Sequence, residues 1–235
     1  MAETLPAVFI PGLQSDATAW TAQMGAFDRT LVLPGGYHKA PSIEAMGRVI
    51  ERDLPERFHL VGWSMGGYIA LSMVERLARR VASLSVIATS ARAEANAPRP
   101  GRAETVARAR ALGLLRHQEE VLRASFFEPA RVDEPLPQAM IAAAERLGLR
   151  ALEAQIAAIV ERPDRRSLLP TLKVPTQVIV GEADNVTPPL LAEEIAAGIA
   201  NATLHVIEAA GHCVPVEKPD AVNARLGRLF DRYDA

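Results

Sequence analysis

One serine in the chain is placed for nucleophilic chemistry. Ser64 is the centre of a Gly-x-Ser-x-Gly run at residues 62–66, which directly follows the apolar run at residues 58–61. A strand before this run and a helix after it would make a sharp turn that lifts the Ser64 hydroxyl out of a sheet. Glycines on both sides tolerate the crowding and unusual dihedral angles of such a turn. The sequence therefore predicts that Ser64 is a nucleophile.

A histidine and an aspartate supply the other groups that this chemistry needs. A serine hydroxyl becomes reactive when a base takes its proton during the attack. His212 is the candidate base because imidazole titrates near neutral pH, and Asp184 would accept the other ring N–H and stabilise the imidazolium. Ser64, Asp184 and His212 each lie just past a predicted strand, so we expect the three side chains to converge at one edge of a sheet.

Each of these residues also has a purely structural interpretation. Ser64 could be a small residue in a glycine-rich turn, Asp184 a helix cap or turn residue, and His212 a loop histidine with its hydrogen bonds satisfied. Two other acids compete with Asp184 for its role. Glu182 lies before the turn that is expected to carry the acid, and Asp164 is followed by two arginines, which favours a surface ion pair.

The elements that would position these residues alternate between strands and helices. Apolar runs predict strands, and stripes of apolar residues at four-residue spacing predict core-facing helices between them. Ser42 is expected to cap a helix that runs to about Leu54, and Thr187 to cap a later one. Such alternation predicts a parallel sheet that is covered on both faces, an α/β architecture. The predicted strands cover residues 7–10, 30–33, 58–61, 84–88, 176–180 and 203–207.

The alternation stops in the middle of the chain. Residues 91–170 hold no convincing strand and are rich in Ala, Arg, Leu and Glu, a composition that predicts helices. A structureless connection of this length is rare in compact domains. We therefore expect residues 91–170 to form a helical cap over the carboxyl ends of the strands, where ligands bind in open parallel sheets. Residues 1–90 and 171–235 would form the two parts of the core.

Composition excludes several other classes of protein. The net charge of −2 for 235 residues gives no electrostatic support for nucleic acid or an anionic membrane as a partner. The amino-terminal residues do not resemble a signal peptide, and no apolar run is long enough to span a bilayer, so we expect a cytoplasmic protein. The single cysteine, Cys213, is expected to be a packed small residue, and the histidines show no metal-ligand spacing.

The motifs together resemble the α/β-hydrolase superfamily over essentially the whole chain. Its order of Ser, then Asp, then His matches Ser64, Asp184 and His212, and residues 10–16 look like its first active-site loop. The resemblance implies that the backbone N–H groups of Met65 and Leu13 form an oxyanion hole. Pro11 stands where many members have histidine. The segments at 162–164, 174–176 and 187–189 look like a bacterial branch near the enol-lactonases and haloperoxidase-type esterases.

The resemblance implies a serine hydrolase that needs no cofactor or metal. Its substrate would be a small, mostly apolar carboxylic ester, lactone or thioester, cleaved through an acyl-enzyme on Ser64. The same triad also serves carbon–carbon bond hydrolysis and cofactor-free perhydrolysis, and some proteins of this fold act as slow-turnover receptors of small ligands. Trp63, Phe126 and Phe127 are candidates to line the pocket, although all three could instead pack in the core. The sequence leaves the oligomeric state and the physiological substrate open.

Overall fold

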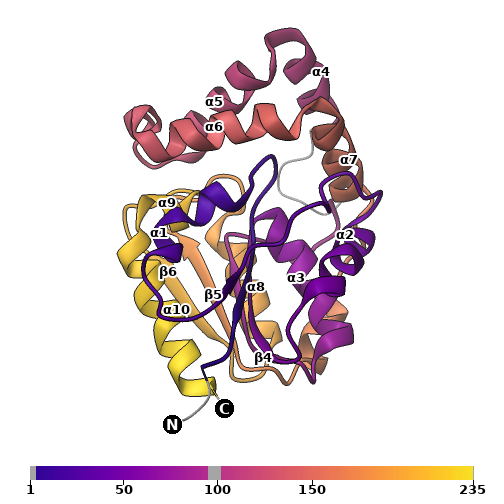
Figure 1. Ribbon diagram of the computed structural model, residues 1–235, viewed down its shortest axis with the longest axis vertical. Helices are drawn as coiled ribbons and strands as arrows, with labels where there is room; N and C mark the ends of the chain where they lie inside the picture. Colours follow the sequence, from indigo (N-terminus) through magenta and orange to yellow (C-terminus); the bar gives the residue numbers. More distant parts are fainter. Residues whose placement is uncertain (1–3, 95–101, 235) are drawn as a thin grey trace.

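A six-stranded parallel sheet organises the molecule (Figure 1). The computed structural model describes residues 4–94 and 102–234. The strand order is β2-β1-β3-β4-β5-β6, and every neighbouring pair is parallel. The predicted α/β fold is therefore confirmed, with strand β2 shorter than expected. The strands are β1 (Ala7–Ile10), β2 (Leu31–Val32), β3 (Phe58–Trp63), β4 (Val81–Ile87), β5 (Thr176–Gly181) and β6 (Thr203–Ile207).

Helices cover both faces of this sheet, and each face has its own apolar core. One core joins the sheet to α2 (Ile43–Ile50), α3 (Met65–Leu77) and α8 (Pro189–Gly198). The other joins it to α10 (Pro219–Tyr233), with the short helices α1 (Thr21–Met24) and α9 (Val214–Glu217) nearby (Figure 1). Burial on both sides explains why the central strands are nearly continuous apolar runs. Short 3₁₀ segments lie at Ala17–Trp20, Glu51–Asp53, Pro129–Asp133 and Arg166–Thr171.

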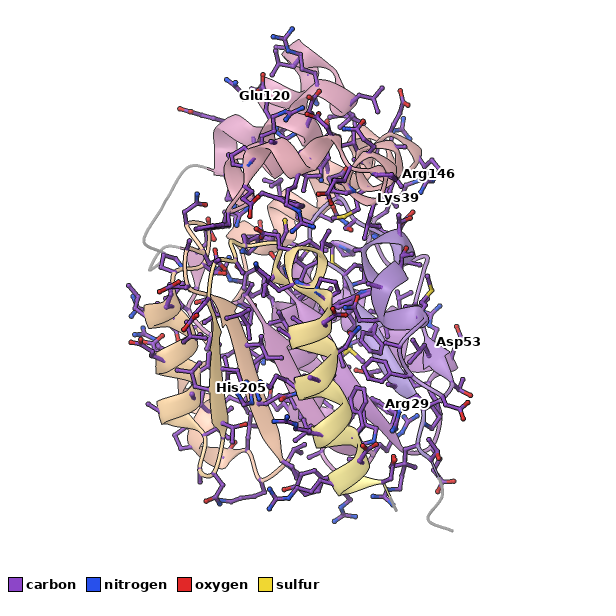
Figure 2. The ribbon with its side chains drawn as sticks, turned by 90° about the vertical axis from the view of Figure 1, so that its left-hand side faces the viewer. Arg29, Lys39, Asp53, Glu120, Arg146 and His205 are labelled. Atoms are coloured by element: carbon purple, nitrogen blue, oxygen red, sulfur yellow. The ribbon has the colours of Figure 1, made fainter. Side chains whose placement is uncertain are left out.

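Four helices form a separate layer above the carboxyl ends of the strands (Figure 1). We call α4 (Arg102–Leu112), α5 (Leu114–Ser125), α6 (Pro135–Leu147) and α7 (Leu149–Val160) the upper helical layer. The described part of residues 91–170 consists of helices and their short connections, and it contains no strand. Figure 2 shows Glu120 on the outer side of this layer and Arg146 near its junction with the core. Among the described residues, no helix combines the length and the apolar character that crossing a bilayer requires.

Capping explains where one of the predicted helices begins. The Ser42 hydroxyl accepts a hydrogen bond from the backbone N–H of Ala45 at 3.1 Å, as expected for the residue that caps α2. The α-helix ends at Ile50, and a 3₁₀ turn continues it to Asp53, two residues before Pro55. The predicted helix between Ser42 and about Leu54 is therefore confirmed in position, with a tighter last turn.

The carboxyl-terminal end of α10 is fastened to the core by one carboxylate. Asp234 accepts hydrogen bonds from both terminal nitrogens of Arg29 at 3.0 and 3.1 Å, and from the backbone N–H of Leu5 at 3.1 Å. His59 Nε2 lies 3.0 Å from the same carboxylate. Burial raises the pKa of Asp234, but the hydrogen bonds from Arg29, His59 and Leu5 outweigh it and lower the pKa from 3.8 to about 2.

We expect Asp234→Asn to destabilise the protein in a pH-dependent way. A carboxyl whose pKa is lower in the folded state adds stability above its unfolded pKa and loses it as the pH falls through the folded value. For this partly solvated group we expect a loss of about 1 kcal/mol at pH 7, which shrinks as the pH falls from 4 towards 2. Urea unfolding of both proteins over this range measures the difference. A constant difference would show that the ionisation of Asp234 contributes nothing.

Candidate active site

Ser64 occupies a strained turn between β3 and α3. Its φ of 55° and ψ of −118° fall outside the regions that ordinary residues prefer. A Cβ at Gly62 would collide with the backbone of Gly66, and a Cβ at Gly66 would collide with the carbonyl of Ile10. The two flanking glycines therefore allow β3, α3 and β1 to approach one another closely enough to form the turn. The Ser64 backbone N–H is tied to the carbonyl of Ile87 at 2.9 Å.

The structure brings Ser64, His212 and Asp184 into one hydrogen-bonded chain. His212 Nε2 lies 2.9 Å from Ser64 Oγ, and His212 Nδ1 lies 2.9 Å from Asp184 Oδ2. Asp184 and His212 are buried, with exposed fractions of 3% and 7%. The three residues follow β3, β5 and β6, so the parallel sheet places all of them at its carboxyl edge. This arrangement can move a proton from the hydroxyl to the imidazole.

Backbone and hydroxyl donors hold the Asp184 carboxylate in place. Oδ1 accepts hydrogen bonds from the backbone N–H groups of Val186 at 2.9 Å and Thr187 at 2.8 Å, while Oδ2 accepts one from the Thr187 hydroxyl at 2.8 Å. Burial alone raises the pKa of Asp184, but His212 and the donors from Thr187 outweigh it, so the pKa lies below its usual value. The carboxylate is therefore ionised at neutral pH.

The structure corrects the predicted role of Thr187. Helix α8 begins at Pro189, and the residue at its N-cap is Pro188, which makes no side-chain capping bond. The Thr187 hydroxyl instead donates to Asp184 and lies 3.3 Å from His212 Nδ1. A threonine before two prolines has the sequence pattern of a helix start, and only the folded turn shows that its hydroxyl serves the carboxylate.

The loop that carries His212 is fixed by contacts that sequence reasoning missed. The His212 backbone N–H donates to the Ser125 carbonyl at 2.8 Å, and Trp63 Nε1 donates to the His212 carbonyl at 3.0 Å. Glu217, 4% exposed, accepts hydrogen bonds from the backbone N–H groups of Gly211 at 3.0 Å and Phe127 at 2.7 Å. Glu217 therefore ties the histidine loop to the segment that follows α5.

The two residues expected to supply an oxyanion hole belong to α3 and to the loop after β1. Met65 is the first residue of α3, so its N–H is among the helical donors that have no intrahelical acceptor. Leu13 lies in the loop after β1 and lines the cavity next to Ser64. Pro11 leaves the loop short of one donor, but the amides of Leu13 and Met65 do not depend on it.

A cavity of about 340 Å³ opens onto Ser64 and His212. Its floor comes from the core, and its roof comes from the upper helical layer. The cavity is less apolar than the sequence predicts, because α4 contributes charged residues to it. The apolar lining includes Leu13, Trp63, Val121, Leu122, Met140, Leu152 and Val186, and the polar lining includes Arg102, Glu104, Arg108, His117 and Gln118.

The three aromatic candidates for the pocket have different positions. Trp63 lines the cavity. Phe126 is 5% exposed and packs in the core on the α10 face, whereas Phe127 is 46% exposed. Neither phenylalanine lines the cavity. Their adjacency in sequence gave no direction for either side chain, since the turn after α5 points them different ways.

The two rival acids take no part in the hydrogen-bonded chain of Ser64, His212 and Asp184. Asp164 forms an ion pair with Arg166 at 2.7 Å. Glu182 is exposed and receives a long hydrogen bond of 3.4 Å from the backbone of Ala209.

Cys213 is buried beside His212, where burial raises the pKa of its thiol well above the usual range. Within residues 4–94 and 102–234, no group of three or more His, Cys, Asp or Glu side chains could hold a metal ion.

Comparisons with known proteins agree with the fold and the motifs. The chain belongs to the alpha/beta hydrolase family, whose model matches residues 7–225. A pimeloyl-[acyl-carrier protein] methyl ester esterase of Neisseria meningitidis is 27% identical over 175 residues, which are 72% of this chain and 56% of that relative. The matched region therefore spans little more than half of that esterase.

Solved structures extend the similarity to the whole chain. An esterase from Thermogutta terrifontis is 26% identical, with a TM-score of 0.81 over 100% of this chain and 92% of its own. The enol-lactonase from Burkholderia xenovorans LB400 has the same fold, with a TM-score of 0.84, 24% identity, and coverage of 97% and 92%. The family model and these structures confirm the resemblance to the α/β-hydrolase superfamily that the motifs indicate.

Proposed function

We propose that the protein is a serine hydrolase that cleaves a carboxylic ester through an acyl-enzyme on Ser64. The observation that carries this proposal is the continuous chain from Ser64 Oγ through both nitrogens of His212 to Asp184, with a distance of 2.9 Å at each link. His212 would take the hydroxyl proton as Ser64 attacks the carbonyl carbon, and would return it to the leaving alcohol. Water would then add to the acyl carbon as His212 takes one of its protons, and His212 would return that proton to Ser64 Oγ as the acid leaves.

The oxyanion of each tetrahedral intermediate would lie between the N–H groups of Leu13 and Met65. Preformed donors at such a position stabilise charge that develops only in the transition state, and loss of one donor typically costs about 10²–10³ in rate. The positive end of α3 adds to this stabilisation. The upper helical layer would act as the cap that covers the reacting ester and limits its size.

The cavity lining favours a substrate with both an apolar and a polar part. Leucine, methionine and valine side chains fit an aliphatic group, whereas the polar lining from α4 and α5 would favour a polar end. Arg102 and Arg108 are paired with Glu94 and Glu120, so their charges are already compensated. The esterase relative from N. meningitidis is named for a methyl ester of an acyl chain carried by a protein. An aliphatic acyl ester therefore fits the proposal better than a bulky aromatic ester.

Hydrolysis of a graded series of esters tests this function. We expect turnover of p-nitrophenyl esters, with a rapid first release of p-nitrophenol as the acyl-enzyme accumulates. Simple lactones and thioesters of the same acyl length would show which bond is preferred. A single stoichiometric release without turnover would identify a ligand receptor instead, and no reaction with any ester together with intact folding would rule out the proposed activity.

A further inference from the structure

The upper helical layer holds the loop that carries Leu13. The next residue, Gln14, donates its backbone N–H to Oε1 of Gln155 in α7 at 3.1 Å. Both residues are buried, with exposed fractions of 1% and 0%. The Gln14 side chain also lies against α6 and α7, within hydrogen-bond distance of Gln155, Ala144 and Leu152. With the Gln155 oxygen facing the Gln14 backbone N–H, the Gln14 side chain presents its Nε2 to the same oxygen at 3.1 Å.

The backbone at Gln14 needs such support. Its φ of 51° is in the left-handed region, which a residue with a side chain adopts only where the surrounding structure holds it. The peptide group between Leu13 and Gln14 adjoins the peptide group that carries the Leu13 N–H, the donor that the proposed function assigns to the oxyanion. Rotation at Gln14 would therefore tilt the Leu13 donor away from the position of the oxyanion.

A histidine fixes the orientation of the Gln155 amide. The Gln14 N–H can only donate, so the group that faces it must be the Gln155 oxygen, and Nε2 then faces Nδ1 of His38 at 3.2 Å. That nitrogen accepts a hydrogen bond only when the imidazole is neutral and carries its proton on Nε2. A neutral His38 with its proton on Nε2 therefore supports the orientation that presents the Gln155 oxygen to Gln14.

The surroundings of His38 favour its neutral form. The residue is 8% exposed, and the Tyr37 ring lies against it with 4.2 Å between centroids. Burial lowers the pKa of His38, and the charge of Asp16 opposes the shift without cancelling it. Asp16 is itself paired with Arg146 of α6 at 2.9 Å, which weakens its effect on the imidazole.

We propose that Gln155 is a positioning residue for the oxyanion loop and that His38 holds its amide in the orientation this requires. The proposal rests on the proposed function of the same site. It gives the upper helical layer a part in catalysis, because Gln155 of α7 would hold the core loop that carries the Leu13 N–H. Neither Gln155 nor His38 lines the cavity. Both therefore act through Gln14.

The matched pair Gln155→Leu and Gln138→Leu tests this proposal. Gln138 lies on α6 in the same layer, where its side chain donates to the Val132 carbonyl at 2.8 Å. We expect Gln155→Leu to lower kcat for an ester at least about 10-fold with little change in KM, since full loss of one oxyanion donor costs about 10²–10³. We expect Gln138→Leu to retain wild-type kcat.

Inhibitor binding separates positioning from a general loss of structure. Ser64 Oγ would add to the carbonyl carbon of a trifluoromethyl ketone, its proton would pass to His212, and the carbonyl oxygen would become the oxyanion. The matching methyl ketone binds without this addition. Gln155→Leu should weaken the trifluoromethyl ketone by the same factor as kcat/KM and leave the methyl ketone unchanged.

Two substitutions at His38 provide a test that keeps Gln155 intact. The amide oxygen of His38→Asn can replace Nδ1 as an acceptor and restore activity to within about threefold, whereas His38→Leu removes the acceptor and should resemble Gln155→Leu. The double variant His38→Leu/Gln155→Leu should be no worse than either single variant, because the two residues act through one chain of contacts.

The outcomes distinguish this proposal from the proposed function. Wild-type kcat in folded Gln155→Leu, equal weakening of both ketones, or equal activity in His38→Asn and His38→Leu would overturn the positioning role while leaving the serine hydrolase intact. A wild-type protein that neither hydrolyses esters nor forms the trifluoromethyl ketone adduct would overturn both. Selective weakening of the trifluoromethyl ketone, together with rescue by His38→Asn, would establish the positioning role.

Discussion

Replacement of Ser64 by alanine is expected to abolish covalent labelling by a fluorophosphonate and to reduce ester hydrolysis by about 10⁴-fold or more. The hydroxyl lies 2.9 Å from the base that would activate it, and alanine leaves His212 with no proton to take. The oxyanion donors belong to the backbone, so they remain and supply only a residual rate. Labelling followed by mass spectrometry of the modified peptide, together with steady-state kinetics, measures both effects.

Ser125 provides the matched control for this experiment. It also lines the cavity, but its hydroxyl donates to the Val121 carbonyl at 2.6 Å. Its contact with His212 is made by its backbone carbonyl, which an alanine at this position would keep. Ser125→Ala should therefore keep the label on Ser64 and most of the activity. A label found on Ser125, or unchanged labelling of the Ser64→Ala protein, would contradict the assignment of the nucleophile.

The elements that support the site are the part of the fold that the sequence predicts best. Each strand is a short apolar run stopped by glycine, proline or a polar turn. The glycines of the Gly-x-Ser-x-Gly run leave the space that β3, α3 and β1 need to approach one another closely. Because the strands are parallel, residues that follow β3, β5 and β6 must share one edge of the sheet. The position of Ser64, Asp184 and His212 just after predicted strands therefore predicts that the three share this edge.

The residues that support these three could not be predicted in the same way. Gln155 belongs to α7 and Glu217 to α9, and each contacts a backbone N–H far from it in the sequence. No periodic pattern in the sequence marks Gln155 as a residue that contacts the loop after β1, because this contact depends on how α7 packs above the core. The directions of Phe126 and Phe127 were equally hard to predict, because they depend on the turn that follows α5.

Asp184→Asn is expected to lower kcat by about 10⁴-fold while leaving the fold intact. The backbone N–H groups of Val186 and Thr187 both donate to Oδ1, so the amide oxygen of the new asparagine must occupy that position. Its NH₂ group then replaces Oδ2, 2.9 Å from His212 Nδ1. A donor at this point forces the imidazole proton onto Nε2, where it faces Ser64 and prevents the ring from acting as a base.

This tautomer argument makes a further distinction that kinetics can test. Thr187→Val removes the hydroxyl that donates to Oδ2 but leaves an acceptor for His212, so its loss of kcat should be far smaller than that of Asp184→Asn. The rival acids supply the controls, since Glu182→Gln and Asp164→Asn should retain wild-type kcat. Near-normal turnover by Asp184→Asn, or a large loss in either control, would transfer the role of the acid to another residue. Equal losses in Asp184→Asn and Thr187→Val would instead show that the geometry of the turn matters and the charge does not.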